Sequence, residues 1–314
     1  MRLSRPFAGL VAGCLAPLAA GCAGSDVDTT VDGLAEAPEA IALVALTWRG
    51  DASQTPTGLA QVYVIDHQAG RRAAALELLS MPAAAEVLDT SLGLGECRVD
   101  RPRGNPGAIV LRDAGEIAVE GDLGVNVLDS SWLPEGSLDI SGVAYAGLLG
   151  PRGKDARRPL QVVADGSPEV GPFTVQLTPP PPVRLLAVGG REVVKGRVQL
   201  SAGDLTQHLE IVWEGLPAEA EPTAPTASDL TVVVFERRSF GATWTISCVA
   251  PSGANDGDDG HFTIPAAALL ALPDLGADRT DSVVVRRIAS TSFAARSVAE
   301  GMALAVSEDQ AYVE

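Results

Sequence analysis

The sequence predicts an all-β fold, and three observations support this prediction. From residue 41 onward the chain consists of short segments rich in Val, Ile, Leu and Thr. Gly, Pro, Asn and Asp separate these segments at about strand length, as expected for strands joined by turns. Apolar residues recur at every second position in several segments, which is typical of a strand with one face on a core.

Six segments of the first half fit this pattern. The alternation is clearest in 61–66 and 173–177. The simplest arrangement is sequential antiparallel pairing. The six predicted strands are Ile41–Trp48, Leu59–Asp66, Leu94–Val99, Glu116–Glu120, Leu160–Ala164 and Phe173–Leu177.

A proline run divides the chain body. Pro179 to Pro182 are four successive prolines, which cannot donate ladder hydrogen bonds and favour a stiff, extended chain. We therefore expect a linker at 179–183 between a first β-sandwich domain at 41–178 and a second at 184–314. Each part has the size and the strand content of an immunoglobulin-like sandwich.

The second half contains further predicted strands at His208–Gly215, Asp229–Glu236 and Thr243–Val249, and we expect Trp213 to lie in the core. Residues 217–228, rich in Pro, Ala, Thr and Glu, are expected to form an exposed hairpin loop. Pro265–Leu272 predicts a short helix, because proline suits the first helical position and Ala and Leu favour helix.

The N-terminus has the pattern of a bacterial export signal. Arg2 and Arg5 precede an uncharged apolar run at 7–20, and Gly21 and Cys22 follow. The run is too short to span a bilayer. The segment 19–22 resembles the lipobox of bacterial lipoproteins, although Ala19 stands where the strict motif favours Leu. This resemblance implies a signal peptide at 1–21, lipidation of Cys22 and, because Ala23 rather than Asp follows, the outer membrane. Ordinary secretory cleavage is the alternative.

The segment 22–40 is acidic and almost free of large apolar residues, so we expect a flexible tether. Without Arg2 and Arg5, 21 basic residues face 40 acidic ones, a net charge of −19. This charge disfavours nucleic acid and anionic lipid as partners and favours solubility, cations or basic ligands.

After lipidation of Cys22 and loss of Cys14, two cysteines remain, Cys97 and Cys248. In an oxidising compartment they are expected either to pair as a disulfide or to stay as buried thiols.

The loop at 255–260 crowds oxygen donors around two glycines: Asn255, Asp256, Asp258 and Asp259. Calcium is the one cofactor that this loop suggests. The spacing does not match an EF-hand, and a solvated turn explains the same residues.

Catalytic motifs are absent from the sequence. It has no HExxH, no G-x-S-x-G, no P-loop, no Cys-x-x-Cys and no dinucleotide fingerprint. Asp66 with His67, and His208 with Glu210, are the nearest to a catalytic pair, so a hydrolase that uses acidic residues on a β scaffold remains an alternative. Aromatic residues are only 4% of the chain, and Trp132 is the tryptophan expected to be exposed.

Three parts of the second half, Trp213–Gly215, Cys248 and Asp259–Pro273, together with Asp113–Val119 in the first, resemble myxobacterial-type two-domain β-sandwich lipoproteins. The resemblance implies architecture and carries over no active residues. We therefore expect an exported, lipid-anchored cell-envelope protein, facing the periplasm or the cell surface. Its expected role is binding or structural, with an envelope protein or glycan as partner. A hydrolase and a calcium-stabilised adhesion module are the alternatives.

Overall fold

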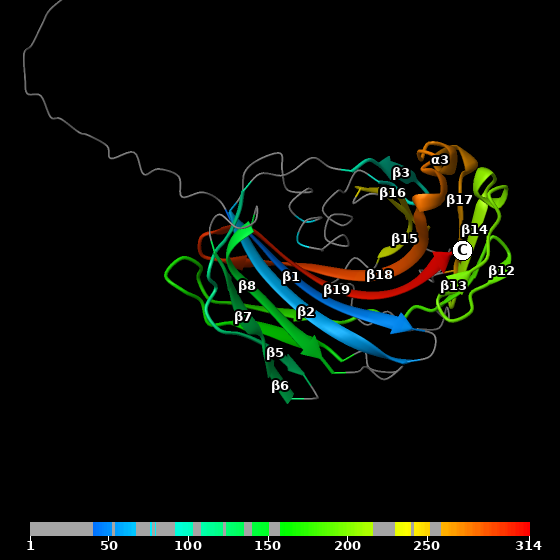
Figure 1. Cartoon of the computed structure of the whole chain (residues 1–314). Helices are drawn as coiled ribbons and strands as arrows, with labels where there is room; N and C mark the ends of the chain where they lie inside the picture. Colours follow the sequence, from blue (N-terminus) through cyan, green and yellow to red (C-terminus); the bar gives the residue numbers. More distant parts are fainter. Residues whose placement is uncertain are drawn as a thin grey trace, which may run out of the picture. The chain divides into compact units, whose positions relative to one another are not determined.

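Contacts group residues 37–314 into one compact unit, and its regular structure is almost entirely β, which confirms the predicted fold class (Figure 1). The expected signal peptide, Cys22 and most of the expected tether at 22–40 lie outside the described residues. The computed structural model describes residues 40–51, 54–66, 76, 79, 92–102, 108–121, 124–134, 140–150, 158–215, 230–239, 242–251 and 259–314.

Eleven strands of the described part form a large mixed sheet. Its order is β3-β16-β15-β18-β19-β1-β2-β4-β8-β7, with β13 paired to β19 and β8 also paired to β2. The strands are β1 (Ala40–Asp51), β2 (Gln54–Asp66), β3 (Cys97–Asp100), β4 (Ile109–Leu111), β7 (Asp129–Leu133), β8 (Ile140–Leu149), β13 (Arg197–Val198), β15 (Leu230–Ser239), β16 (Ala242–Val249), β18 (Thr280–Ala295) and β19 (Val298–Val313).

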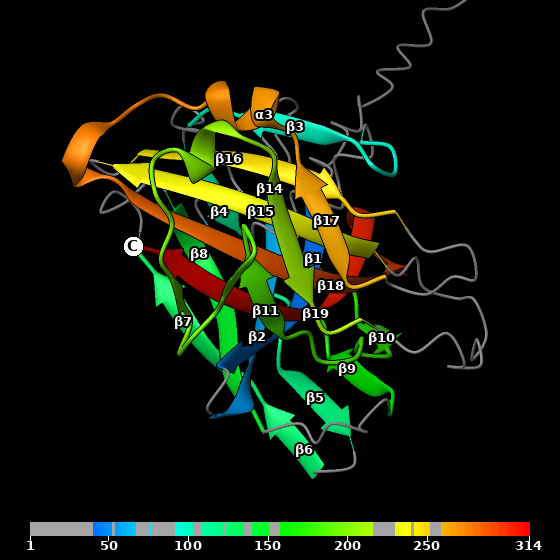
Figure 2. The same cartoon turned by 90° about the vertical axis from the view of Figure 1, so that its right-hand side faces the viewer.

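Two smaller sheets of four strands each complete the β structure (Figure 2). The first has the order β10-β9-β5-β6, with β10 (Phe173–Leu177), β9 (Leu160–Ala164), β5 (Ile117–Gly121) and β6 (Gly124–Val127). The second has the order β12-β11-β14-β17, with β12 (Arg191–Glu192), β11 (Leu185–Val188), β14 (Leu209–Trp213) and β17 (His261–Ile264). In the described part of the chain, the helical elements with given bounds are α3 (Ala266–Leu270) and the 3₁₀ turns η1 (Asp204–Thr206) and η2 (Gly276–Asp278).

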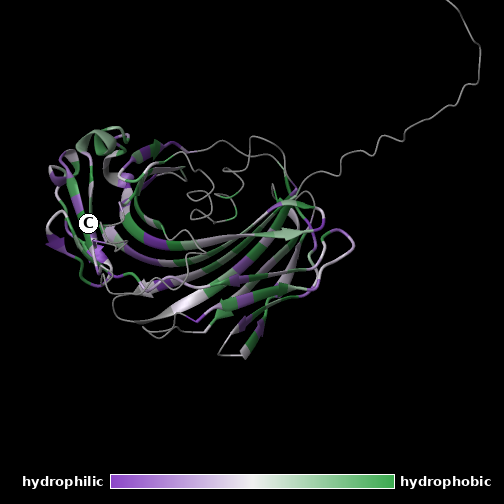
Figure 3. Cartoon of the chain, turned by 180° about the vertical axis from the view of Figure 1, so that it is seen from behind, coloured by the Kyte–Doolittle hydropathy of each residue, from purple (hydrophilic) through white to green (hydrophobic). Residues whose placement is uncertain are grey.

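Both small sheets pack on the same face of the large sheet, which we call its outer face. Val44 and Ala305 of the large sheet share one buried cluster with Val162 of the first small sheet. Phe235 shares another with Ile211 of the second. The opposite, inner face carries a third cluster that includes Leu43. Figure 3 shows apolar and polar positions along the strands, and successive side chains of a strand lie on opposite faces of the sheet.

The large sheet contains strands from both halves of the chain, which differs from the expected tandem of two separate sandwiches. β1 of the first half pairs in parallel with β19, the last strand of the second. β3 likewise pairs with β16 across the expected boundary. The physical reason lies in β1, where 40–46 is buried on both faces, as in an interior strand of a sheet whose two faces are both covered.

The expected linker packs against the large sheet. The amide of Val183 donates to Ser307 Oγ at 3.1 Å, and that of Leu185 donates to Asp309 Oδ2 at 2.7 Å. Arg287 donates through Nη1 to the Pro182 carbonyl oxygen at 2.6 Å and through Nη2 to that of Glu214. These polar side chains lie on the outer face, so the chain passing between the small sheets keeps its backbone groups hydrogen-bonded.

Local predictions agree with the structure better than pairing predictions do. The expected strands at 160–164 and 173–177 are β9 and β10, and the predicted helix contains α3, with Pro265 as its N-cap. The prediction of antiparallel pairing throughout was wrong, because β1 with β19 and β4 with β8 are parallel. The expected hairpin around 217–228 was also wrong, since β14 and β15 lie in different sheets.

Tyr145 holds β8 against the start of β5. Its buried hydroxyl accepts a hydrogen bond from the amide of Ala114 at 2.9 Å and donates one to Asp113. Burial, together with the hydrogen bond to Asp113, raises the pKa of Tyr145 well above its usual range, so the hydroxyl stays protonated. The first small sheet is thereby fixed to the outermost strands of the large one.

Candidate functional site

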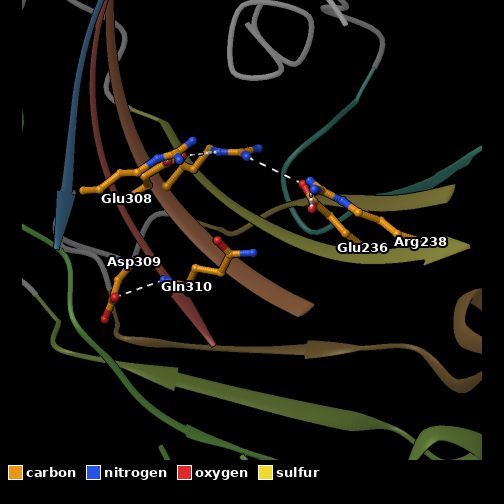
Figure 4. A network of polar contacts seen from close by, with 7 residues as sticks. Glu236, Arg238, Glu308, Asp309 and Gln310 are labelled. Atoms are coloured by element: carbon orange, nitrogen blue, oxygen red, sulfur yellow. Dashed lines mark hydrogen bonds and ion pairs between the residues drawn. The ribbon is translucent and has the colours of Figure 1, made fainter. Parts of the chain in front are cut away.

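Five alternating charges cross the inner face of the large sheet, and we call them the charge row: Arg49, Glu308, Arg286, Glu236 and Arg238 (Figure 4). They come from four adjacent strands, β1, β19, β18 and β15. Arg286 Nε lies 2.9 Å from Glu308 Oε2, and Arg286 Nη2 lies 3.9 Å from Glu236 Oε1. The row connects strands of both halves through side chains as well as through backbone pairing.

The centre of the row is buried and its ends are exposed. Side-chain exposure is 4% for Arg286, 6% for Glu236 and 8% for Glu308. Arg49 pairs with Glu308 and is 74% exposed, and Arg238 pairs with Glu236 at 2.7 Å and is 60% exposed. Each buried carboxylate therefore contacts two guanidinium groups, which offsets the cost of removing its charge from water.

The pKa of Glu308 shows whether burial or ion pairing has the larger effect on this side chain. Burial alone raises this pKa, but the attraction of Arg286 and Arg49 outweighs burial, and the pKa of Glu308 is lowered from its ordinary value. A catalytic general acid needs the opposite shift, toward neutral pH. The charge row thus has the chemistry of a structural ion-pair network.

A second region combines exposure with apolar chemistry, and we call it the β6–β7 edge. It comprises Val125 and Val127 of β6 and Trp132 of β7, which are 64%, 50% and 71% exposed. β7 is the last strand of the large sheet, and β6 the last of the first small sheet, within the described part of the chain. The prediction that Trp132 is exposed is confirmed, as is the burial of Trp48 and Trp213, while Trp244 is half-buried.

The edge residues are positioned by the turn from one sheet into the other. Leu128 is buried between β6 and β7. The Asn126 side chain points toward the large sheet and donates from Nδ2 to the Leu148 carbonyl oxygen at 2.6 Å. Because side chains alternate along a strand, Val125 and Val127 point away from the large sheet, into solvent.

The stretch of sequence that contains β6 and β7 carries acidic residues and no basic ones. From residue 113 to residue 150 it contains seven acidic residues and no Lys or Arg: Asp113, Glu116, Glu120, Asp122, Asp129, Glu135 and Asp139. Sequence reasoning treated the negative charge only as a property of the whole chain. This local run was the observation that could have located the edge.

Cys97 and Cys248 are joined by a disulfide bond in the structure. They occupy opposed positions on β3 and β16, with their Cα atoms 4.1 Å apart. Cys248 is fully buried and both cysteines contact the core under the second small sheet. The bond links β3, a strand of the first half, to β16, a strand of the second half.

The calcium hypothesis falls mostly outside the described residues, which include Asp259 but not Asn255, Asp256 or Asp258. Asp259 is exposed. Within the described part, no group of three or more His, Cys, Asp or Glu side chains is placed to hold a metal ion. The hypothesis stays a prediction.

Of the residues considered for catalysis, the structure describes Asp66, His208 and Glu210. His67 lies outside the described residues, whereas Asp66 pairs with Arg112. His208 and Glu210 are both exposed and flank Leu209, which is buried in the core. This arrangement is typical of solvated positions on one face of a strand.

No helix in the described part is long and apolar enough to cross a membrane. The chain gave no match to any protein-family model and no match to a curated protein.

Proposed function

We propose that this chain is an exported, lipid-anchored protein of the cell envelope whose folded body has a binding or structural role. Two features of the sequence support export: the basic and apolar N-terminal segment and the lipobox-like residues ending at Cys22. Anchoring through Cys22 would hold the body at the outer membrane, facing the periplasm or the cell surface.

The disulfide between Cys97 and Cys248 is the observation that carries this proposal. Disulfides persist in oxidising compartments outside the cytosol and are rare within it. The bond is independent of the N-terminal pattern, because it lies in the folded body. Both observations therefore favour the same compartment.

A binding or structural role is favoured by the state of the buried carboxylates. Glu236 and Glu308 each contact guanidinium groups, and Asp281 contacts Arg237 in a bidentate pair. Each of these buried carboxylates is therefore held in an ion pair with arginine. By contrast, the exposed apolar side chains of the β6–β7 edge form the kind of surface through which proteins bind partners.

Mass spectrometry of the membrane fraction tests the anchor. We expect a mature N-terminus at Cys22 that carries diacyl or triacyl lipid, and loss of this species when globomycin blocks the lipoprotein signal peptidase. A Cys22→Ser variant is expected to leave the membrane fraction, while the matched variant Cys14→Ser stays in it. A mature N-terminus elsewhere without lipid would contradict the anchor and make the protein freely secreted.

A further inference from the structure

We propose that the β6–β7 edge binds an extended, basic segment of a partner protein, which adds to β7 as a further strand of the large sheet. This inference rests on the proposed binding role and names the class of partner. It goes beyond lipid anchoring, because it concerns a surface of the folded body.

The backbone of β7 supplies the first argument. β7 pairs with β8 on one side only, from Asp129 opposite Ala146 to Leu133 opposite Gly142. Its other side is the end of the sheet in the described part of the chain. A peptide that adds as a strand gains affinity from main-chain hydrogen bonds and specificity from side-chain contacts at alternate positions.

The composition of β7 leaves this side open to a partner. Its sequence, Asp-Ser-Ser-Trp-Leu, contains neither Lys nor Pro, the residues with which proteins commonly prevent pairing at an edge. Residues Asp129 to Trp132 are all exposed. β7 therefore offers a short polar strand with one large aromatic side chain.

Trp132 supplies an anchor. At 71% exposure its ring offers both apolar area and a face that attracts Lys or Arg side chains. Tryptophan is also enriched among the residues that dominate binding energy at protein interfaces.

The negative charge of this edge indicates the charge that a partner should carry. The seven acidic residues between 113 and 150 have no basic residue among them, so the edge favours a positively charged segment and increases its rate of encounter. A second copy of this chain is a poorer partner. Pairing β7 with itself would bring two acidic edges together, and like charges across strands are destabilising.

Binding of a synthetic peptide tests the proposal. A dye-labelled ten-residue peptide of alternating Lys and Val is titrated with the full-length protein in mild detergent at 0.15 M salt, and anisotropy is recorded. We expect saturable binding of this peptide and none of the Glu-Val counterpart. Trp132→Ala and Asp129→Lys are each expected to weaken binding about tenfold.

Two matched variants control for nonspecific attraction to an acidic protein. Leu270 is 63% exposed on α3, and Glu169 is exposed between β9 and β10, so both lie outside the edge. Leu270→Ala and Glu169→Lys are expected to leave the affinity unchanged. Equal losses in Asp129→Lys and Glu169→Lys, with no loss in Trp132→Ala, would overturn the proposal, because binding would then follow net charge alone.

Backbone pairing is tested separately from charge. The same Lys-Val peptide, N-methylated at every residue, keeps its charge and loses the backbone donors on both of its edges, so we expect it not to bind. Hydrogen exchange of residues 129–133 is expected to slow when the unmethylated peptide binds. Equal binding of both peptides, or a dimer of the protein that Trp132→Ala abolishes, would overturn the proposal. Neither result bears on lipidation of Cys22, so the two proposals fail independently.

Discussion

Arg287 on β18 donates a hydrogen bond to the carbonyl oxygen of Pro182, 105 residues away in the chain. The same side chain also donates to the carbonyl oxygen of Glu214. Since Arg287 lies on the outer face between the cores of the two small sheets, these bonds hold the proline segment and the end of β14 to the shared sheet. The expected linker is therefore a packed part of the fold.

Replacing Arg287 with Met is expected to destabilise the protein by about 2–4 kcal/mol, because the carbonyl oxygens of Pro182 and Glu214 lose their charged donor. Urea unfolding followed by tryptophan fluorescence measures this change. Arg296→Met, at an exposed position in the turn before β19, is the control and should change stability by less than about 0.5 kcal/mol. Equal stability of the Arg287 variant and the parent protein would contradict the structural role.

The two halves of the chain are expected to unfold together. β18 and β19, with 16 residues each, carry positions in the cores beneath both small sheets. Urea transitions of the full chain recorded by fluorescence and by circular dichroism should coincide.

A fragment of residues 184–314 tests the same point. In the fragment β19 lacks β1, and Ala303 and Ala305 lose the small sheet that covers them. We expect no cooperative transition. A fragment that unfolds as cooperatively as the full chain would show that the second half is an independent domain.

Loss of the disulfide is expected to cost about 3–5 kcal/mol in the Cys97→Ser, Cys248→Ser double variant, because the bond closes a loop with a sequence separation of 151 and constrains the unfolded chain. Denaturant unfolding measures the difference. In the parent protein, a thiol assay under denaturing, non-reducing conditions should find neither cysteine reactive. Two reactive thiols would mean that the bond is absent from the mature protein.

Glu308 should make stability depend on pH. Because its pKa in the folded protein lies below the ordinary value of 4.5, the ionised side chain contributes stability above that value. The contribution falls as the pH drops through the lower pKa of the folded state. Glu308→Gln is therefore expected to be destabilising by about 2–4 kcal/mol at pH 7 and by progressively less in more acidic solution.

Urea unfolding at several pH values from 7 downward measures this dependence. Glu192→Gln, at an exposed position of β12, is the control and should show no comparable trend. A difference between Glu308→Gln and the parent that is constant with pH would mean that the charge of Glu308 does not stabilise the fold.

The sequence by itself determined the features that depend on local chemistry. Alternating apolar residues located β9 and β10, and Pro265 with the following alanines located α3, because side-chain period and backbone propensity act within a few residues. The burial of Trp213 followed from its strand in the same way. Trp132 is exposed as predicted, but it lies in strand β7 and not in the turn that its neighbours suggested.

Only the tertiary structure decided which strands share a sheet. Arg49 and Glu308 are 259 residues apart, and no local pattern states that β1 must lie beside β19. Two interactions favour this pairing: the burial of both faces of β1 and the ion pairs on the inner face. Both form only when strands that are distant in sequence come together. The same reason explains why the position of β7 at the end of the large sheet, within the described part of the chain, could not be predicted from the sequence.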